Sequence, residues 1–269
     1  MRDIKIIATD MDHTLLTEND TLPPHFGDYL DRLEALGVQF AIASGRPLNT
    51  LRNLFPEHKD RLVMISDNGG VIADHGRIVQ KNLIPLDAVQ EIRAFVRENT
   101  LARPIICTVD SRAIADQLDR PFEKAYRQFY HDLSFMDDQA DWTGECDKIS
   151  LYLPEGSIDD LYEQVIAPRF GADFSAAVTG DVWIDIMMKD VNKGTSLKAL
   201  GDKMQVTADQ MMAFGDNSND KEMLQLVKYS YLVANAKPHM APFADYRTGS
   251  NQEFGVTQVL DQVLAAKEA

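Results

Sequence analysis

The hydrophobic positions of the chain follow two spacings in turn. Short apolar runs rich in β-branched residues predict strands at residues 4–10, 38–44 and 61–66. Between the first two runs, apolar residues recur at helical spacing over residues 26–33, and this pattern predicts a helix that ends near Gly37. Strands that alternate with helices in this way are typical of a parallel sheet.

The same alternation returns near the C-terminal end. Leu197, Leu200 and Met204 lie at helical spacing, and the run MMAFGD at residues 211–216 predicts a strand after them. A second helical segment precedes another predicted strand, YSYLVA, at residues 229–234. The two ends of the chain are therefore expected to contribute to one α/β core.

The middle of the chain has a different texture, because several predicted strands follow one another without a helix between them. A helix is predicted after Asp87 and another over residues 157–170. Strands are predicted at residues 103–110, 111–117, 146–154 and 182–188. This pattern favours an antiparallel α+β insertion. The expected organisation is a discontinuous core, residues 1–83 and 187–269, with an inserted domain at residues 84–186.

Composition and charge narrow the class of protein. The chain has 269 residues, of which 45% are hydrophobic, and its formal net charge is −15. Such a charge repels the phosphate backbone of nucleic acid, so nucleic acid is not an expected partner. The apolar runs are much shorter than the roughly 20 residues that span a bilayer, and no export signal is visible. A cytoplasmic location without a membrane partner is expected, and the oligomeric state stays unknown.

Polar residues of the kinds that serve in catalysis or ligand binding follow several of the predicted core strands. Asp10 ends the first strand within DMDHT, Ser44 ends the second within SGR, and Asp216 ends a C-terminal strand within GDNSND. Lys193, in NKG, stands just before a predicted helix. Taken singly, each is ordinary turn or helix-capping chemistry. Taken together, they are expected to converge, because the carboxyl ends of parallel strands form the ligand crevice of open α/β sheets.

With these four motifs in this order, the chain resembles the haloacid dehalogenase (HAD) superfamily of phosphohydrolases, and specifically its Cof-type subfamily IIB. The resemblance extends over essentially the whole chain. It implies a Rossmann-like parallel-sheet core with an inserted α+β cap of the C2B type after the third core strand. It also implies a Mg²⁺-dependent phosphatase that hydrolyses phosphate monoesters of small metabolites, such as sugar phosphates or phosphorylated cofactors, through an aspartyl-phosphate intermediate.

The resemblance assigns the acidic motif a catalytic and a metal-binding role. Asp10 is the implied nucleophile, and Asp12 the implied acid that protonates the leaving oxygen and later deprotonates water. Asp10, Asp216 and the main-chain carbonyl of Asp12 are the implied Mg²⁺ ligands. A divalent cation also explains two carboxylates so close together, since each would otherwise raise the pKa of the other.

Other motif residues are expected to bind phosphate or substrate. The expected set is Met11, Ser44, Gly45, Arg46, Lys193 and Asn219. A serine and a glycine amide at a helix start suit the non-bridging oxygens of a phosphoryl group, and a lysine places a positive charge on the same oxygens. Asp220 is interpreted either as the partner that orients Lys193 or metal-bound water, or as a carboxylate favoured by the first turn of a helix.

One position departs from the family, which usually has glycine where this chain has His13. Histidine is bulkier than glycine and titratable, so a backbone turn or a substrate entry different from that of the family is expected. A His13 that contacts substrate and a His13 turned toward solvent are both consistent with the sequence. Substrate choice is expected from the insertion, near Asp181, Trp183 and Asp185, although Trp183 also suits core packing.

Two further functions use the same motifs. A phosphomutase or phosphotransferase would form the same aspartyl-phosphate on Asp10 and pass the phosphoryl group to a second hydroxyl. A receiver-like switch would use aspartate phosphorylation itself as the signal. An acid–base residue two positions after Asp10, together with an inserted cap, argues against the switch.

Overall fold

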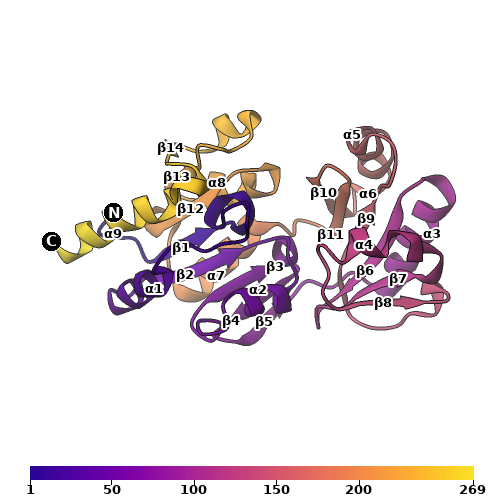
Figure 1. Ribbon diagram of the computed structural model, residues 1–269, viewed down its shortest axis with the longest axis horizontal. Coiled ribbons are helices and arrows are strands. Elements are labelled where there is room, and N and C mark those ends of the chain that lie inside the picture. The colour runs from indigo at the N-terminus through magenta and orange to yellow at the C-terminus, as the bar shows by residue number, and fades with distance from the viewer.

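The computed structural model describes residues 1–269 as two lobes, each built around one β-sheet (Figure 1). The strands of the larger lobe are β1 (Ile6–Thr9), β2 (Gln39–Ala43), β3 (Val63–Ser66), β4 (Val71–Asp74), β5 (Arg77–Lys81), β12 (Met211–Gly215), β13 (Tyr229–Leu232) and β14 (Tyr246–Arg247). Its helices are α1 (Phe26–Ala35), α2 (Leu48–Leu54), α7 (Lys193–Met204), α8 (Lys221–Leu226) and α9 (Gly255–Glu268). The smaller lobe has strands β6 (Arg103–Thr108), β7 (Ala113–Asp116), β8 (Leu133–Met136), β9 (Cys146–Tyr152), β10 (Phe174–Gly180) and β11 (Trp183–Met188), with helices α3 (Leu86–Asn99), α4 (Glu123–Tyr126), α5 (Ile158–Leu161) and α6 (Ala167–Phe170).

The larger sheet has eight strands in the order β14-β13-β12-β1-β2-β3-β4-β5. All neighbours from β14 to β3 are parallel, and the hairpin strands β4 and β5 complete one edge in antiparallel pairing. From β1 the chain progresses outward through β2 and β3 on one side, and from β12 through β13 and β14 on the other. The strand order therefore reverses between β1 and β12, which is where ligands bind in open α/β sheets.

Helices cover both faces of this sheet, which explains why β1 is apolar along most of its length (Figure 1). Ile7 belongs to an apolar cluster with residues of α1, α2 and α9. Ile6 and Ala8, which point to the other face, belong to a cluster with residues of α7 and α8. Strands buried on both faces lose the alternation of polar and apolar residues that half-exposed strands show. The predicted α/β fold with a parallel-sheet core is confirmed.

The first helix illustrates how local signals set the element boundaries. Its buried residues are Phe26, Leu30 and Leu33, at the spacing that places them on one face. After the helix the chain reaches Gly37 with φ +69, a left-handed backbone that glycine adopts without a steric penalty. The predicted start and end of this helix match the structure.

The smaller sheet has six strands in the order β10-β11-β9-β6-β7-β8. Its pairings are antiparallel, as predicted for the insertion, except that β7 and β8 are parallel. A long connection through residues 117–132, which includes α4, carries the chain back so that β8 runs alongside β7. Neither β8 nor β10 was expected from the sequence. Ile92 of α3 and Ile149 of β9 lie in the apolar cluster of this lobe.

The insertion does not follow the third core strand directly, as the sequence suggested, because the hairpin strands β4 and β5 come first. The turn at residues 67–70 makes this reversal possible, and Gly69 there has φ +108. The proposed boundary at 83/84 falls between β5 and α3, whereas that at 186/187 falls inside β11. The division of the chain into core and cap domains stays a prediction.

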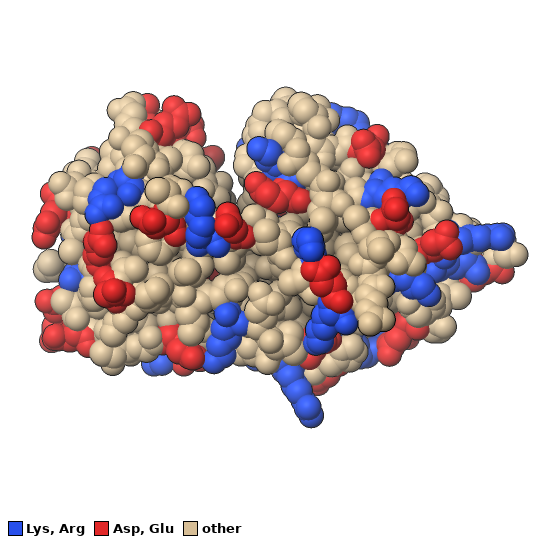
Figure 2. Space-filling model, turned by 180° about the vertical axis from the view of Figure 1, so that it is seen from behind, with Lys and Arg blue, Asp and Glu red and all other residues tan.

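The two lobes lie end to end, and Figure 2 shows a notch between them. Strands β10 and β11 form the side of the smaller sheet that faces the larger lobe (Figure 1). Strand β10 contacts the turn at Ser218–Asp220, which follows β12. No helix combines the length and hydrophobicity that a membrane-spanning segment requires.

Candidate active site

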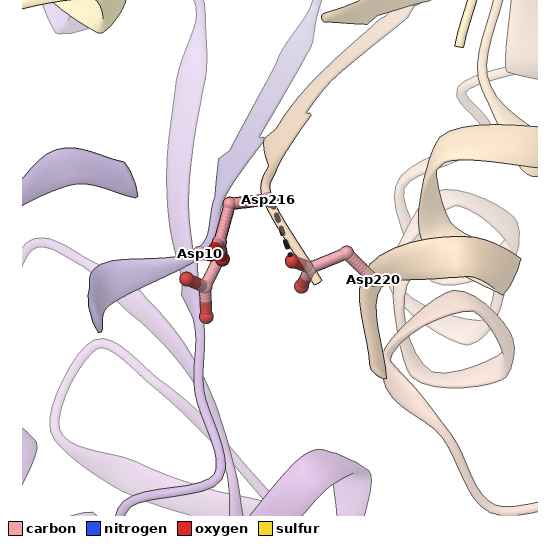
Figure 3. Close-up of side chains that lie close together, drawn as sticks. All are labelled: Asp10, Asp216 and Asp220. Atoms are coloured by element: carbon pink, nitrogen blue, oxygen red, sulfur yellow. Dashed lines mark hydrogen bonds between the residues drawn. The ribbon is translucent and has the colours of Figure 1, made fainter. Parts of the chain in front are cut away.

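Three aspartates meet where the strand order of the larger sheet reverses (Figure 3). Asp10 follows β1, and Asp216 follows the neighbouring strand β12. The backbone amide of Asp10 donates to the carbonyl of Phe214 over 3.0 Å, so the two strand ends lie in register. One carboxylate oxygen from each of Asp10, Asp216 and Asp220 lies within 4.8 Å of the others, and all three residues are buried. We call these three residues the acidic cluster.

Lys193 supplies the one positive charge that directly contacts the acidic cluster. Its ammonium donates to Asp10 Oδ1 over 2.6 Å and to Asp220 Oδ1 over 2.7 Å, and the residue is fully buried. Burial favours the neutral amine, but the charges of Asp10 and Asp220 outweigh burial and raise the pKa of Lys193. The lysine is held at the first position of α7 by the capping box of Asn192 and Thr195.

Asp220 acts through both of its oxygens on neighbouring groups. Oδ1 accepts from Lys193, and Oδ2 accepts from the backbone amides of Asp216 over 2.9 Å and Asn217 over 3.2 Å. The first of these amide contacts is the dashed line in Figure 3. Of the two interpretations from the sequence, the contact with Lys193 agrees with the orienting role, and Asp220 also lies at the start of α8.

Asp216 is the least compensated member of the acidic cluster. Its Oδ1 accepts a hydrogen bond from the Thr14 hydroxyl over 3.3 Å, and no lysine or arginine forms an ion pair with it. Burial raises the pKa of Asp216 to about 6, and the charge of Asp220 adds to the increase, while Lys193, His13 and the bond from Thr14 oppose it. Burial likewise raises the pKa of Asp10, against the effect of Lys193.

The donor set fits a divalent cation. Three buried carboxylates face a single ammonium, so the acidic cluster carries an excess of negative charge that burial makes unfavourable. Hard carboxylate oxygens are the ligands that Mg²⁺ prefers. Because Asp220 already accepts three hydrogen bonds, Asp10 Oδ2 and the Asp216 carboxylate are the oxygens best placed to hold an ion.

The Asp12 side chain does not join the acidic cluster. It accepts hydrogen bonds from Arg46, whose Nε lies 3.0 Å from both Asp12 oxygens. Arg46 also contacts Asp20 at 2.6 Å. The structure thus brings two predicted site residues together, but as an ion pair at the rim of the site, where 42% of the Asp12 side chain is exposed.

The predicted phosphate-binding residues differ in how many of their polar groups the protein itself already engages. Ser44 is fully buried after β2, and its Oγ accepts from the backbone amide of Arg46 over 3.1 Å. The Asn219 side-chain amide donates to Asn68 Oδ1 over 3.0 Å and keeps a second N–H available. The Met11 side chain lies in the apolar core, so only its backbone amide is available to a ligand.

His13 has the left-handed backbone that glycine would adopt in this turn, with φ 60 and ψ 6. Its carbonyl accepts from the Asn235 side chain over 2.7 Å, and its side chain is exposed. The turn typical of glycine is thus retained in spite of the substitution. His13 does not line the cavity described next, so its geometry favours the solvent-facing interpretation.

A cavity of about 520 Å³ lies between the lobes, next to the acidic cluster. Asn68, Lys193 and Asn219 border it from the larger lobe. Residues of the α5–α6 segment and β10 line it from the smaller lobe, among them Tyr162 and Val178. Trp183 lies elsewhere, packed 5.0 Å from Tyr152 between ring centroids, as its core-packing interpretation expects.

Sequence reasoning missed two residues beside this site. Asn68 was not among the expected site residues, yet it borders the cavity and bonds to Asn219. Lys148 of β9 was not noted at all, although it is buried and reaches the 44–46 loop. A signal was present, because Asp147 and Lys148 are adjacent charges inside an otherwise apolar predicted strand.

Comparison with known proteins agrees with this geometry. The chain is 29% identical over 266 residues to 5-amino-6-(5-phospho-D-ribitylamino)uracil phosphatase YbjI of Escherichia coli, covering 97% of this chain and 96% of that protein. The structure of SMU.1108c from Streptococcus mutans superimposes with a TM-score of 0.91 at 28% identity, over 97% of this chain and 99% of that one. The HAD subclass IIB sugar phosphatase BT4131 shares the fold, with a TM-score of 0.79 at 20% identity over 96% and 98% of the two chains.

The family of haloacid dehalogenase-like hydrolases matches residues 7–260, which is most of the chain. With phosphatases among its relatives, this match confirms the predicted enzyme class, a phosphoric monoester hydrolase. The four motifs, the reversed strand order at β1 and β12, and the buried acidic cluster are all present in one molecule. The chain therefore belongs to the haloacid dehalogenase-like hydrolase family.

Proposed function

We propose that the enzyme is a Mg²⁺-dependent phosphatase of small phosphorylated metabolites that works through a phosphorylated Asp10. The observation that carries the proposal is the environment of Asp10. Lys193 orients the carboxylate through Oδ1, while Oδ2 accepts no hydrogen bond from the protein, and the carboxylate lies beside that of Asp216. A carboxylate oriented in this way can use one oxygen as the nucleophile while the other binds the cation.

Asp10, Asp216 and the main-chain carbonyl of Asp12 are the proposed Mg²⁺ ligands. Bound Mg²⁺ would supply positive charge that screens the repulsion between a carboxylate and a phosphate. The residues of the chain perform the other tasks. Lys193, the Ser44 hydroxyl, the Gly45 amide and Asn219 bind the non-bridging oxygens and stabilise the charge that develops on them.

The proposed reaction has two displacements at phosphorus. An Asp10 oxygen forms a bond to phosphorus while the bond to the leaving oxygen breaks, and protonated Asp12 transfers its proton to that oxygen. Asp12, now ionised, then takes a proton from water, which attacks the same phosphorus and releases inorganic phosphate and the Asp10 carboxylate. Because Arg46 holds the Asp12 carboxylate in the structure, Asp12 must leave Arg46 before it serves as the acid.

The cavity between the lobes is the proposed site of the leaving group. Its volume of about 520 Å³ is in the range of small-molecule sites. Apart from Lys193, the charged residues that line the cavity are Asp159, Glu163 and Glu222, which are acidic, and Lys189, whose ammonium donates to the carbonyl of Gly171. The three carboxylates outnumber this lysine and disfavour a second phosphate, so we propose a leaving group without further negative charge, such as a sugar or a polyol attached to a ring. The substrate named for YbjI, 5-amino-6-(5-phospho-D-ribitylamino)uracil, is the first candidate of this kind to test.

The test measures release of inorganic phosphate from p-nitrophenyl phosphate and from a panel of sugar phosphates and phosphorylated cofactors. We expect release that requires Mg²⁺, is abolished by EDTA, and falls roughly a thousandfold or more in Asp10→Asn. Asp209→Asn, which removes an exposed carboxylate outside the site, is the matched control. Release that survives EDTA and Asp10→Asn would contradict the proposal.

Asp12→Asn separates the two displacements. Loss of a general acid–base residue lowers the rate roughly 10²- to 10⁴-fold. Activated aryl esters need little help from an acid in the first displacement, so hydrolysis of the aspartyl-phosphate, which needs the base, becomes the slower step. Labelled phosphate should therefore accumulate on Asp10 in this variant. Transfer of the label to a second hydroxyl instead of water would indicate a phosphotransferase. The cytoplasmic location and the absence of nucleic acid and membrane partners stay predictions from the sequence.

A further inference from the structure

A buried ionic group joins the smaller lobe to the larger one beside the proposed phosphate site. Lys148 of β9 is 2% exposed, and its ammonium lies 2.8 Å from Asp67 Oδ1 and 3.4 Å from Asp185 Oδ2. The same ammonium donates to the backbone carbonyl of Gly45 over 2.9 Å. A smaller-lobe lysine therefore holds the backbone of the loop that contains Ser44, Gly45 and Arg46.

The contact matters because it completes the support of the 44–46 loop. The carbonyl of Ser44 accepts from the backbone amide of Asn68 over 2.9 Å, and that of Gly45 accepts from Lys148. Both peptide groups that flank Gly45 are thus held through their carbonyls. The amide of Gly45 donates to no protein acceptor, so it stays available to a phosphate oxygen.

A second chain of hydrogen bonds runs from the same group to Asn219. The Asn68 side chain donates to Asp185 Oδ2 over 3.1 Å, and its Oδ1 accepts from Asn219 Nδ2 over 3.0 Å. Asp67 and Asn68 have φ values of 50 and 53, a left-handed backbone that Asp and Asn adopt more readily than most residues other than glycine. Contacts with Lys148 and Asp185 of the smaller lobe hold their side chains in this turn.

Burial of the charges also argues for a role beyond packing. Asp147 is fully buried without a hydrogen-bond partner, and Tyr130, Ser150 and Cys107 face the same group from the smaller lobe. Buried ion pairs stabilise folds weakly compared with apolar packing, because desolvation offsets the attraction. The position of this lysine is better explained by the loop that it holds.

We infer that Lys148 is a positioning residue that links the placement of the smaller lobe to the geometry of the phosphate-binding loop. The inference rests on the proposed function for the role of that loop. Lys148 does not line the cavity between the lobes, so it acts on the phosphate and not on the leaving group. Movement of the smaller lobe away from the larger one would remove the donor from the Gly45 carbonyl.

The test is Lys148→Met, with binding of inorganic phosphate in the presence of Mg²⁺ measured by titration calorimetry. Since a hydrogen bond from a charged group supports the loop, we expect phosphate affinity to fall about tenfold. The ratio kcat/KM should fall by one common factor for p-nitrophenyl phosphate and for larger esters. A loss that depends on the leaving group, or an unchanged phosphate affinity in the folded variant, would overturn the inference.

Tyr130→Phe is the matched control. Its hydroxyl donates to Ser150 Oγ over 2.7 Å within the same buried group, yet it makes no contact with the 44–46 loop. We expect a lower melting temperature and an unchanged phosphate affinity. An equal loss of phosphate affinity in Tyr130→Phe and Lys148→Met would overturn the inference, because it would point to a general effect of stability.

A second variant keeps the test decisive if Lys148→Met does not fold. Lys148→Met combined with Asp67→Asn removes both charges of the closest ion pair and still leaves the Gly45 carbonyl without its donor. Wild-type phosphate affinity in this folded double variant would refute the positioning role. Failure of the proposed function gives a different result, namely a wild-type enzyme that binds phosphate but has no turnover dependent on Asp10.

Discussion

At the scale of a single residue, the buried charge of Asp216 lowers the stability of the metal-free protein while it provides a proposed metal ligand. The carboxylate is buried, and its pKa of about 6 lies above the ordinary value of 3.8. Between about pH 4 and pH 6, the Asp216 carboxyl binds more protons in the folded metal-free protein than in the unfolded chain. The contribution of Asp216 to the stability of the metal-free protein is therefore greatest below about pH 4 and decreases as the pH rises to about 6. A bound cation would relieve this penalty, because it favours the charged form.

Asp216→Asn should therefore stabilise the metal-free protein at pH 7.5, by about 1 to 3 kcal/mol, because the amide carries no charge to bury. The gain should shrink toward pH 4, where the wild-type carboxyl is protonated. Mg²⁺ should raise the melting temperature of the wild type and leave that of the variant unchanged. Thermal unfolding across pH, with and without Mg²⁺, measures both effects. Equal stability of the two proteins at every pH would contradict the expectation.

At the scale of elements, the start of α7 determines where the Lys193 ammonium lies. Gly194 follows Lys193 directly, and a Cβ added at Gly194 would meet the backbone of Glu222 in α8 at 2.5 Å. No room exists for a methyl group there unless α7 and α8 move apart. The close approach of these two helices thus fixes the lysine relative to the acidic cluster.

Gly194→Ala should destabilise the protein by about 1 to 3 kcal/mol, as overpacking of a close contact usually does. It should also lower kcat, because Lys193 shifts with the end of the helix. Gly180→Ala in β10 is the matched control, since its added Cβ meets Trp183 Cδ1 at an ordinary 3.6 Å. Urea unfolding and phosphate release measure the two effects. Similar behaviour of both variants would show that α7 does not position Lys193 in this way.

At the scale of the whole molecule, the two lobes have largely separate hydrophobic interiors. The apolar clusters of the smaller lobe contain only residues of that lobe. Of the smaller-lobe residues, Val109 alone is buried in a cluster of the larger lobe. Polar contacts, such as that of Lys148 with Gly45, join the lobes instead. Elements with separate cores are expected to open as separate cooperative units.

Ile149→Ala should therefore accelerate hydrogen exchange in β6, β9 and β11 and leave β1, β2 and β12 protected. Ile149 is fully buried in the smaller lobe, and its truncation costs about 2 to 5 kcal/mol. Ile7→Ala, at a fully buried position of the larger lobe, should reverse the pattern. Hydrogen exchange measured by mass spectrometry shows which of the two sheets loses protection in each variant. Uniform acceleration in both sheets would show that the molecule unfolds as one unit.

Much of the larger lobe was predictable because its signals are local. Hydrophobic spacing defined the strands that become β1, β2, β3 and β12, and Gly37 marked a helix end. The hairpin strands β4 and β5 were missed, since a turn such as SDNGG does not show which sheet its strands join. The parallel pairing of β7 with β8 depends on a 16-residue connection, residues 117–132, whose path no local pattern encodes.

In the candidate site, too, some features were predictable from local sequence signals and others depended on tertiary packing. That Asp10 and Asp216 should meet followed from the sequence alone, because parallel strands end at one edge of their sheet and turn chemistry marks those ends. Lys193 begins a helix and does not end a core strand, so its place beside them was expected from the set of motifs and the family resemblance. Tertiary structure alone decided that Arg46 holds Asp12, that Asp220 uses both oxygens, and that Lys148 reaches a carbonyl 103 positions away along the chain. The physical reason is that periodicity and turns are properties of neighbouring residues, whereas the partner of a buried charge depends on which distant segments packing brings beside it.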